Sequence, residues 1–124
     1  MRESDVIVLC CPLTPQTRGL IDADALALAK PTAILINVAR GPVVDAAALA
    51  DALAREALGG AALDVHDVQP LPAEAAIRRA PRVLLTPHVA GGTATSMRRM
   101  SAGAVDDMLR MLGGQAPSHP VNTF

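Results

Sequence analysis

The stretch ILINVARGPVVDAAAL, residues 34–49, contains an apolar run that stops at a charged residue, Arg40. The β-branched and leucine residues at 34–38 predict a short strand buried on both faces, as in a parallel sheet. A glycine and a proline end this strand, and Asp45 is suited to cap a following helix. Arg40 therefore falls in a strand-to-helix turn, where open α/β sheets bind ligands. A loop arginine alone is more often a surface residue. Whether Arg40 has a functional role therefore depends on the residues in the rest of the chain.

The remaining sequence alternates strands and helices in the same way. Strands are predicted over residues 6–11, 33–39, 61–65 and 82–86, and helices over residues 23–30, 46–58, 73–79 and 95–112. Asp22 is suited to cap the first helix and Pro31 to end it, and Gly59 and Gly60 are expected to close the second. This order predicts an α/β fold with a parallel, helix-covered sheet. Residues 115–124 have no periodicity and predict a tail.

Composition excludes several classes of function. With 51% hydrophobic and 19% charged residues, the 124-residue chain fits one globular domain. The net charge of -1 gives no basic surplus, which argues against nucleic acid as a partner. The apolar runs are too short for a membrane span or a signal peptide, so we expect a cytoplasmic protein. Cys10 and Cys11 are expected to be reduced and buried, because a disulfide between neighbours is strained.

The sequence has almost no aromatic residues and lacks a phosphate-binding glycine motif. The chain has no Trp or Tyr and one Phe, so the core must be built from Ala, Val, Leu, Ile and Met. Burial contributes about 25 cal/mol per Å², and small side chains must supply the area, so we expect modest stability. The phosphate-binding pattern G-x-G-x-x-G does not occur.

The last predicted helix carries a continuous apolar stripe. Its members are Met97, Met100, Ala104, Met108 and Met111. Methionine mostly fills gaps in packed contacts, so this methionine stripe is interpreted as a core or subunit contact. We therefore expect a homo-oligomer in which the helix is buried.

Informative residues follow each predicted strand at its carboxyl end. Pro12 and Thr17 follow the first strand, Arg40 the second, Asp64 the third and His88 the fourth. Parallel strands bring these ends to one edge of the sheet, and this convergence favours a functional role for Arg40.

Four motifs occur in the order CPLTPQTRGLI, INVARGPVVD, GAALDV and LLTPHVAGGT. Together they resemble the D-isomer specific 2-hydroxyacid dehydrogenases, a family that includes phosphoglycerate, glycerate and formate dehydrogenases, over residues 4–112. The resemblance implies an NAD-dependent oxidoreductase, with NADP not excluded, that transfers a hydride between nicotinamide and a 2-hydroxy or 2-oxo acid. It also implies that residues 1–113 form the second half of a Rossmann-type, doubly wound parallel sheet plus a C-terminal crossing helix, without the glycine-rich half. Residues 114–124 are then a tail.

The resemblance assigns catalytic roles to Arg40 and His88. In the family, the arginine of the NVARG motif holds the substrate carboxylate and carbonyl, and the histidine of the TPH motif is the acid-base. A planar guanidinium can grip a 2-oxo acid at two points, and an imidazole can supply a proton near neutral pH. The residues that the resemblance places around the cofactor are Cys11, Pro12, Thr17, Val38, Ala39, Arg40, Asp64, His88, Val89, Ala90 and Gly91.

Gln69 departs from the family pattern. Members usually carry DVFEPEPLP where this chain has DVHDVQPLP, so Gln69 replaces a glutamate that orients the histidine and favours its protonated form. Gln69 can orient the ring but adds no charge, and formate dehydrogenases, which need no proton transfer, also have a glutamine there. The surrounding segment is closer to the generic hydroxyacid enzymes. Asp67 is an alternative source of the missing charge.

Two further interpretations stay open at this point. A non-catalytic binding or assembly module on the same fold would use the methionine stripe to dock a partner. A metal site would draw on Asp64, His66, Asp67 and His88, but their spacing matches no ligand pattern that we recognise, so we expect no metal. The expected partners are a small 2-hydroxy or 2-oxo acid and either a second copy or a missing N-terminal half.

Overall fold

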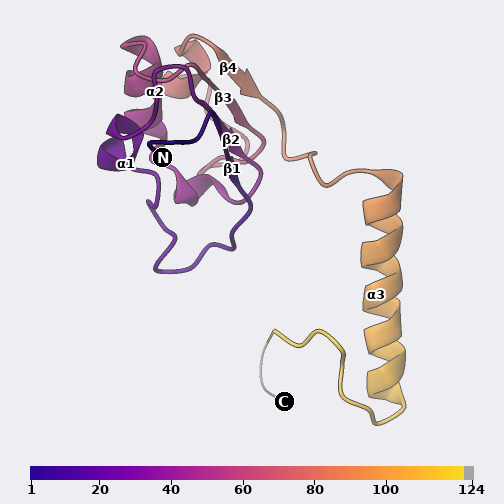
Figure 1. Ribbon diagram of the computed structural model, residues 1–124. Coiled ribbons are helices and arrows are strands. Elements are labelled where there is room, and N and C mark those ends of the chain that lie inside the picture. The colour runs from indigo at the N-terminus through magenta and orange to yellow at the C-terminus, as the bar shows by residue number, and fades with distance from the viewer. Residues whose placement is uncertain (122–124) are drawn as a thin grey trace. The chain divides into compact units, whose positions relative to one another are not determined.

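The computed structural model describes residues 1–121 and arranges four strands in one parallel sheet (Figure 1). The strands are β1 (Val6–Leu9), β2 (Ile34–Asn37), β3 (Gly60–Leu63) and β4 (Val83–Leu85). They lie in the order β1-β2-β3-β4, and every neighbouring pair is parallel. This arrangement confirms the predicted α/β fold, and it brings all four carboxyl ends to one edge of the sheet.

The chain divides into two compact units. Residues 1–90 form the first unit, and the second begins at Gly91. The helices are α1 (Ala23–Ala27), η1 (Gly41–Val43), α2 (Ala46–Ala54), η2 (Ala76–Arg79) and α3 (Ala94–Leu112), of which only α3 belongs to the second unit.

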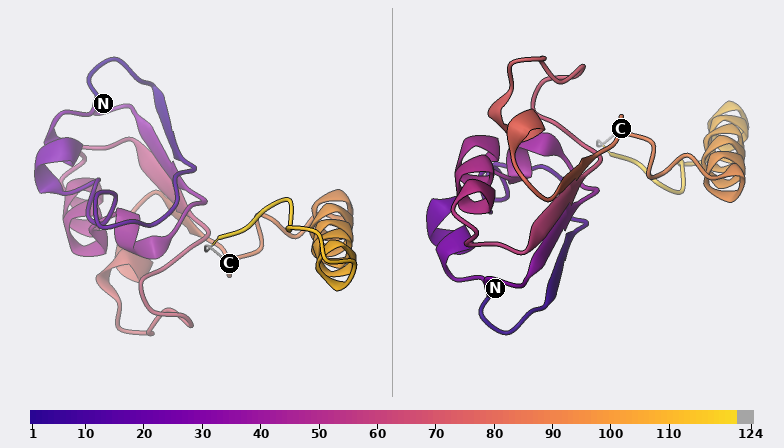
Figure 2. Two further views of the ribbon diagram at one scale, coloured as in Figure 1. Left: turned by 90° about the horizontal axis from the view of Figure 1, so that it is seen from below. Right: turned by 90° about the horizontal axis from the view of Figure 1, so that it is seen from above.

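In the first unit, α1 and α2 lie on the same face of the sheet (Figure 2). A crossover between parallel strands is right-handed, and successive strands here advance in one direction, so every crossover lies on the same side. The opposite face carries Val6, Val8, Ile34 and Leu84, whose exposed fractions range from 43% to 62%. The prediction that the strand at 34–38 is buried on both faces is therefore wrong, because nothing in residues 1–90 covers this bare face.

The core of the first unit lies between the sheet and the helices. Leu35, Leu49 and Leu53 are fully buried, and the last two lie on one face of α2, as the periodicity predicts. Asp45 caps α2, because its carboxylate accepts hydrogen bonds from the two amides of residues 47 and 48 at 3.0 Å. The buried core of this unit contains Leu, Ile, Val and Ala, and Met1 packs against it half-buried.

Both predicted helices that precede β3 are too long. The first has its predicted cap, since Asp22 accepts from the Ala25 amide at 2.8 Å, but it ends at Ala27 rather than at Pro31. The second was predicted to reach residue 58 but ends at Ala54. Shortly after this end, Glu56 takes a left-handed φ of 57°.

Arg82, far along the chain, holds the segment after α2. Its Nη2 donates to the carbonyls of Leu53 and Leu58 at 3.2 and 3.4 Å. Gly59 and Gly60 therefore do not close α2 as predicted, since Gly60 already begins β3. Arg82 itself has a left-handed φ of 53°, so β4 begins one residue later than predicted.

The second unit consists of α3 and the chain that follows it. Thr93 caps α3 by accepting from the Ser96 amide at 3.1 Å. The Ser118 amide donates to the Asp107 carboxylate at 2.6 Å, and this hydrogen bond lowers the pKa of Asp107. The chain after α3 thus folds back on the polar side of the helix, whereas residues 122–124 of the predicted tail lie outside the described residues.

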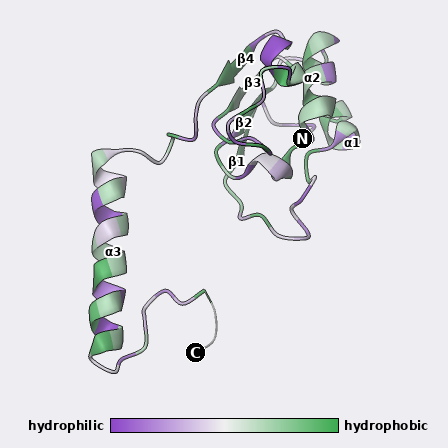
Figure 3. Cartoon of the chain, turned by 180° about the vertical axis from the view of Figure 1, so that it is seen from behind, coloured by the Kyte–Doolittle hydropathy of each residue, from purple (hydrophilic) through white to green (hydrophobic). Residues whose placement is uncertain are grey.

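Hydrophobic and hydrophilic residues alternate along α3 (Figure 3). The four methionines of the methionine stripe are exposed. Within residues 1–121, no helix is both long and apolar enough to cross a membrane.

Candidate functional site

Backbone hydrogen bonds hold the carboxyl ends of neighbouring strands together. The Asp64 amide donates to the Asn37 carbonyl at 3.0 Å, and the Thr86 amide donates to the Leu63 carbonyl at 3.0 Å. The candidate residues therefore begin where the sheet ends, and the predicted shared edge is confirmed.

Asn37 shapes the turn that presents Arg40. It is 1% exposed, and its Oδ1 accepts from the Ala39 amide at 3.0 Å. Its Nδ2 donates to the Arg40 carbonyl, also at 3.0 Å. No sequence pattern used above predicts this role, although a polar residue that closes an apolar strand is a usable signal. Because both ends of its amide are bound, Asn37 fixes the turn, while the Arg40 side chain stays exposed.

An open groove of about 510 Å³ lies beside this turn, between the ends of β1 and β2. It is lined by Cys10, Cys11, Pro12, Leu13, Val38, Ala39 and Arg40. Five of these seven residues belong to the expected cofactor border. Both cysteines are free thiols, as expected, but Cys10 is exposed and Cys11 half-buried, because β1 ends before them at Leu9. The prediction that both are buried is therefore wrong.

Thr17 is not among the residues that line this groove. Its hydroxyl donates to the Pro12 carbonyl and accepts from the Thr14 amide, both at 2.7 Å. The Thr17 hydroxyl therefore makes these hydrogen bonds within its own loop. The Gly19 amide donates to the Pro42 carbonyl at 2.8 Å, which ties the same loop to the segment after Arg40.

Asp64 lies at the end of β3 and binds the loop that follows β4. It is 5% exposed, its Oδ1 accepts from the Thr86 hydroxyl and from the Val89 amide at 2.9 Å, and its Oδ2 accepts from the Ala90 amide at 2.8 Å. Burial by itself raises the pKa of Asp64. The hydrogen bonds from Thr86, Ala90 and Val89, with a smaller contribution from the charge of His88, outweigh burial and hold the pKa below its ordinary value.

His88 is paired with Gln69. The Nδ1 atom of the imidazole lies 3.2 Å from Oε1 of Gln69. The Gln69 Nε2 donates to the His66 carbonyl at 3.4 Å, which turns the amide oxygen toward the ring. Nδ1 is then the donor and Nε2 is left for another partner; this assignment follows from the hydrogen-bond pattern. Among the described residues, Gln69 rather than Asp67 is the hydrogen-bonding neighbour of His88.

The backbone of His88 has a left-handed φ of 61°. A non-glycine residue in this region stores about 1–3 kcal/mol of strain and stays there only when its surroundings hold it. Gly91, the last residue of the expected cofactor border, belongs to the second unit.

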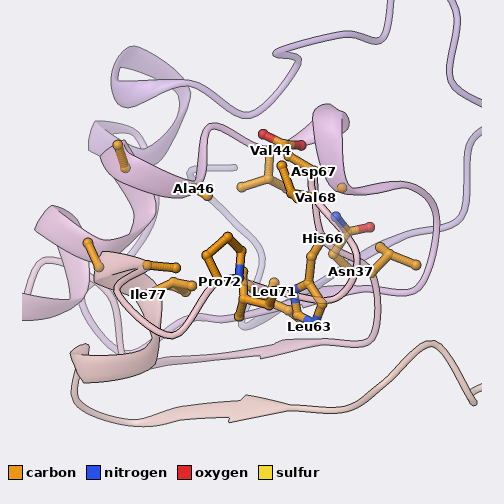
Figure 4. Close-up of a pocket in the computed structure, with 15 residues that line it drawn as sticks. Asn37, Val44, Ala46, Leu63, His66, Asp67, Val68, Leu71, Pro72 and Ile77 are labelled. Atoms are coloured by element: carbon orange, nitrogen blue, oxygen red, sulfur yellow. The ribbon is translucent and has the colours of Figure 1, made fainter.

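Gly41 joins the Arg40 turn to the loop that carries Gln69. A Cβ atom on Gly41 would lie 2.1 Å from the His66 carbonyl carbon and 2.4 Å from the Asp67 nitrogen. Behind this contact is an apolar cavity of about 250 Å³ between α2, η2 and the loop, with His66 and Leu71 in its wall (Figure 4). At Gly41 the two segments with candidate catalytic residues therefore meet backbone to backbone.

The residues considered for a metal site do not converge. No group of three or more His, Cys, Asp or Glu side chains within residues 1–121 is arranged to hold a metal ion. His66 contacts the Thr86 carbonyl through Nε2 at 3.2 Å, and both Asp64 oxygens accept hydrogen bonds.

The family of this chain is shown by its similarity to known proteins. Residues 1–90 match the family model described as D-isomer specific 2-hydroxyacid dehydrogenase, NAD binding domain. The chain belongs to this family. The match includes the Arg40 turn, the Gln69 loop and His88, and it ends where the first compact unit of this 2-hydroxyacid dehydrogenase domain ends.

Individual relatives extend the similarity into α3. Glyoxylate/hydroxypyruvate reductase B from Enterobacter agglomerans is 40% identical over 122 residues, which is 98% of this chain and 38% of the relative. The TT0316 protein from Thermus thermophilus has a TM-score of 0.87 and 42% identity, over 98% of this chain and 39% of that one. A D-isomer specific 2-hydroxyacid dehydrogenase from Xanthobacter autotrophicus Py2, solved with NADPH and MES, has a TM-score of 0.83 and 40% identity, over 96% of this chain and 48% of that one. The chain thus spans less than half the length of each of these relatives.

Proposed function

We propose that this chain carries the catalytic half of the nucleotide-binding domain of an NAD- or NADP-dependent D-2-hydroxyacid dehydrogenase. The reaction interconverts a small 2-oxo acid and the corresponding 2-hydroxy acid, such as the substrates named for glyoxylate/hydroxypyruvate reductase B. The observation that carries the proposal is the His88 imidazole, bound through Nδ1 to Gln69 with Nε2 left free, at the sheet edge that it shares with Arg40. Family membership supports the same reaction.

Arg40 and His88 have different roles: Arg40 binds the substrate and His88 transfers a proton. The Arg40 guanidinium is always charged and grips the carboxylate and carbonyl oxygen of a 2-oxo acid, which polarises the carbonyl. For reduction His88 must carry protons on both ring nitrogens; it gives the Nε2 proton to that oxygen and becomes the neutral ring that keeps its Nδ1 proton on Gln69. During oxidation the neutral ring takes the proton back at Nε2. Gln69 keeps the ring oriented by accepting from Nδ1. A bound reduced nicotinamide supplies the hydride.

The residues of this chain are suited to bind only part of a dinucleotide cofactor. The groove formed by residues 10–13 and 38–40 lies at the carboxyl ends of parallel strands, the usual position of such a cofactor. The sequence has no G-x-G-x-x-G loop to bind the pyrophosphate at a helix N-terminus. We therefore infer that polypeptide outside this sequence supplies the phosphate site. The NADPH in the Xanthobacter relative supports keeping both dinucleotides as candidates.

The bare face of the sheet is the proposed contact for that polypeptide. Val6 and Val8 of the edge strand β1 are more than half exposed, so an added strand and helix would find a free edge and an apolar face together. The methionine stripe of α3 is the proposed contact between copies. We propose a reducing compartment, such as the cytoplasm, because the exposed Cys10 thiol would be open to oxidation outside one.

A reconstitution assay tests the proposal. The chain would be mixed with the part of the Enterobacter reductase that lies outside the aligned region, and NADH consumption followed after glyoxylate is added. We expect turnover from the mixture and a loss of at least about a hundredfold in Arg40→Ala, which removes two charge-assisted hydrogen bonds to the substrate. Arg55→Ala is the matched control, because Arg55 pairs with Asp51 on the exposed side of α2. Equal turnover in Arg40→Ala and Arg55→Ala would contradict the role of Arg40.

The second candidate function is a non-catalytic assembly module. The exposed methionine stripe favours it, since an apolar stripe of this length is stable in water only when covered. Light scattering of the pure chain, with Met100→Lys and Met108→Lys, measures this assembly. A dimer that both substitutions dissociate, together with no turnover in the reconstituted mixture, would favour the assembly module over the enzyme.

A further inference from the structure

We propose that Asp64 is a positioning residue for His88, holding the backbone of the loop after β4 so that the imidazole stays at the sheet edge. The inference rests on the proposed role of His88 as proton donor. It assigns the carboxylate a task inside the protein, whereas the family resemblance placed Asp64 only on the border of the cofactor.

The first support is that both oxygens of the Asp64 carboxylate accept hydrogen bonds from this one loop. Oδ1 accepts from the Thr86 hydroxyl and the Val89 amide, and Oδ2 accepts from the Ala90 amide. The three donors lie before and after His88 in the sequence. Asp64 therefore clamps the backbone on both sides of the histidine, while the ring is bound by Gln69.

The second support is the backbone conformation of His88. Its left-handed φ of 61° is unfavourable for a histidine unless neighbouring bonds hold it. The next two residues, Val89 and Ala90, are the ones whose amides bind Asp64. Loss of these bonds would let the loop leave this conformation and carry the imidazole away from Gln69.

The third support is the chemistry of the acceptor. A carboxylate accepts at both oxygens and donates at neither, so it satisfies three donors at once, and charge shortens such bonds. An amide at the same place has one accepting oxygen, and its NH2 group would face the Ala90 amide. Asp64→Asn therefore changes the clamp and leaves the size of the side chain unchanged.

Nuclear magnetic resonance on the 124-residue chain tests the clamp directly. In Asp64→Asn, amide exchange at Val89 and Ala90 should accelerate by about ten- to a hundredfold, the range for lost hydrogen bonds to a charged group. The nuclear Overhauser contact between the His88 ring and the Gln69 side chain should disappear. Unchanged exchange and an unchanged His88–Gln69 contact in a folded variant would overturn the proposal.

A matched pair at Thr86 covers the case in which Asp64→Asn does not fold. Thr86→Ser keeps the hydroxyl that donates to Asp64 and should preserve the His88–Gln69 contact. Thr86→Val removes the hydroxyl at nearly constant shape and should weaken that contact and raise exchange at Val89. Identical spectra around His88 in the serine and valine variants would overturn the clamp as well.

Kinetics of the reconstituted enzyme separate positioning from cofactor binding. A positioning residue lowers kcat and leaves KM for NADH unchanged, so Asp64→Asn should reduce kcat at least about tenfold with KM for NADH within about twofold of the parent. A raised KM for NADH at unchanged kcat would make Asp64 a cofactor ligand and overturn the proposal. The resonance experiment needs no turnover. It therefore tests the hydrogen bonds of Asp64 even if the chain does not catalyse the proposed reaction.

Discussion

Gly41→Ala should damage both halves of the candidate site at once. Gly41 packs on the backbone of His66 and Asp67, and a Cβ would lie 2.1 Å from the carbonyl carbon of His66. Ordinary carbon–carbon contact begins at about 3.5 Å, so the two backbones must separate by roughly 1.4 Å. No flexible side chain can yield, because all three of the nearest atoms are backbone atoms.

The energetic cost follows from this overlap. Overpacking in well-packed regions typically costs about 1–3 kcal/mol, and a clash between two backbones belongs at the upper end. Urea denaturation followed by circular dichroism measures the change in the free energy of unfolding. The same variant should shift the Gln69 side-chain amide resonances, since Gln69 is held by the displaced His66 carbonyl.

Gly103→Ala is the matched control for Gly41→Ala. A Cβ on Gly103 meets nothing within 4 Å, and the residue lies inside α3. The alanine there should stabilise the helix by about 0.5–1 kcal/mol, because glycine is the poorer helix former. If Gly41→Ala unfolds within about 0.5 kcal/mol of the parent and leaves the Gln69 amide signals in place, the reasoning about the backbone contact is wrong.

Three further outcomes are expected. Gln69→Glu should raise the apparent pKa of the acid group in the pH profile of the reconstituted enzyme, because it adds a negative charge beside His88; an unchanged profile would mean that Gln69 does not partner the histidine during turnover. The chain alone should show no saturable NADH binding below the millimolar range in calorimetry, and a micromolar dissociation constant would contradict the missing phosphate site. Because the pKa of Asp64 is depressed below its ordinary value of 3.8, its contribution to stability is present above that value and is lost as the pH falls through the lower, folded-state pKa. Asp64→Asn should therefore lose less stability than the parent on acidification in this range, and identical acid denaturation of the two proteins would count against the depressed pKa.

The sequence predicts the elements and their shared edge because these depend on local patterns. Apolar runs locate all four strands, and Asp22 and Asp45 are seen to cap the helices that they precede. For the partner of His88 the sequence offers both Gln69 and Asp67, and only the folded chain shows the hydrogen bond to Gln69.

The predictions that are wrong concern features set by contacts between residues far apart in the sequence. The end of α2 is set by Arg82, which lies 24 residues beyond Leu58, so no pattern near the helix reveals it. The bare face of the sheet depends on the direction in which strands are added, which a run of apolar residues does not encode. The clamp by Asp64 joins residues 22 to 26 positions apart and appears only once β3 and β4 are paired.

The most direct test of the account is the turnover of His88→Ala in the reconstituted enzyme, with His119→Ala as the matched control. His119 lies beyond α3 beside Asp107 and has no part in the proposed site. Removal of a general acid typically costs about a hundred- to ten-thousandfold in rate, so the account predicts a loss of this size in kcat for glyoxylate reduction by His88→Ala. It also predicts unchanged kcat in His119→Ala. Turnover of His88→Ala equal to that of His119→Ala would contradict the assignment of proton transfer to this site.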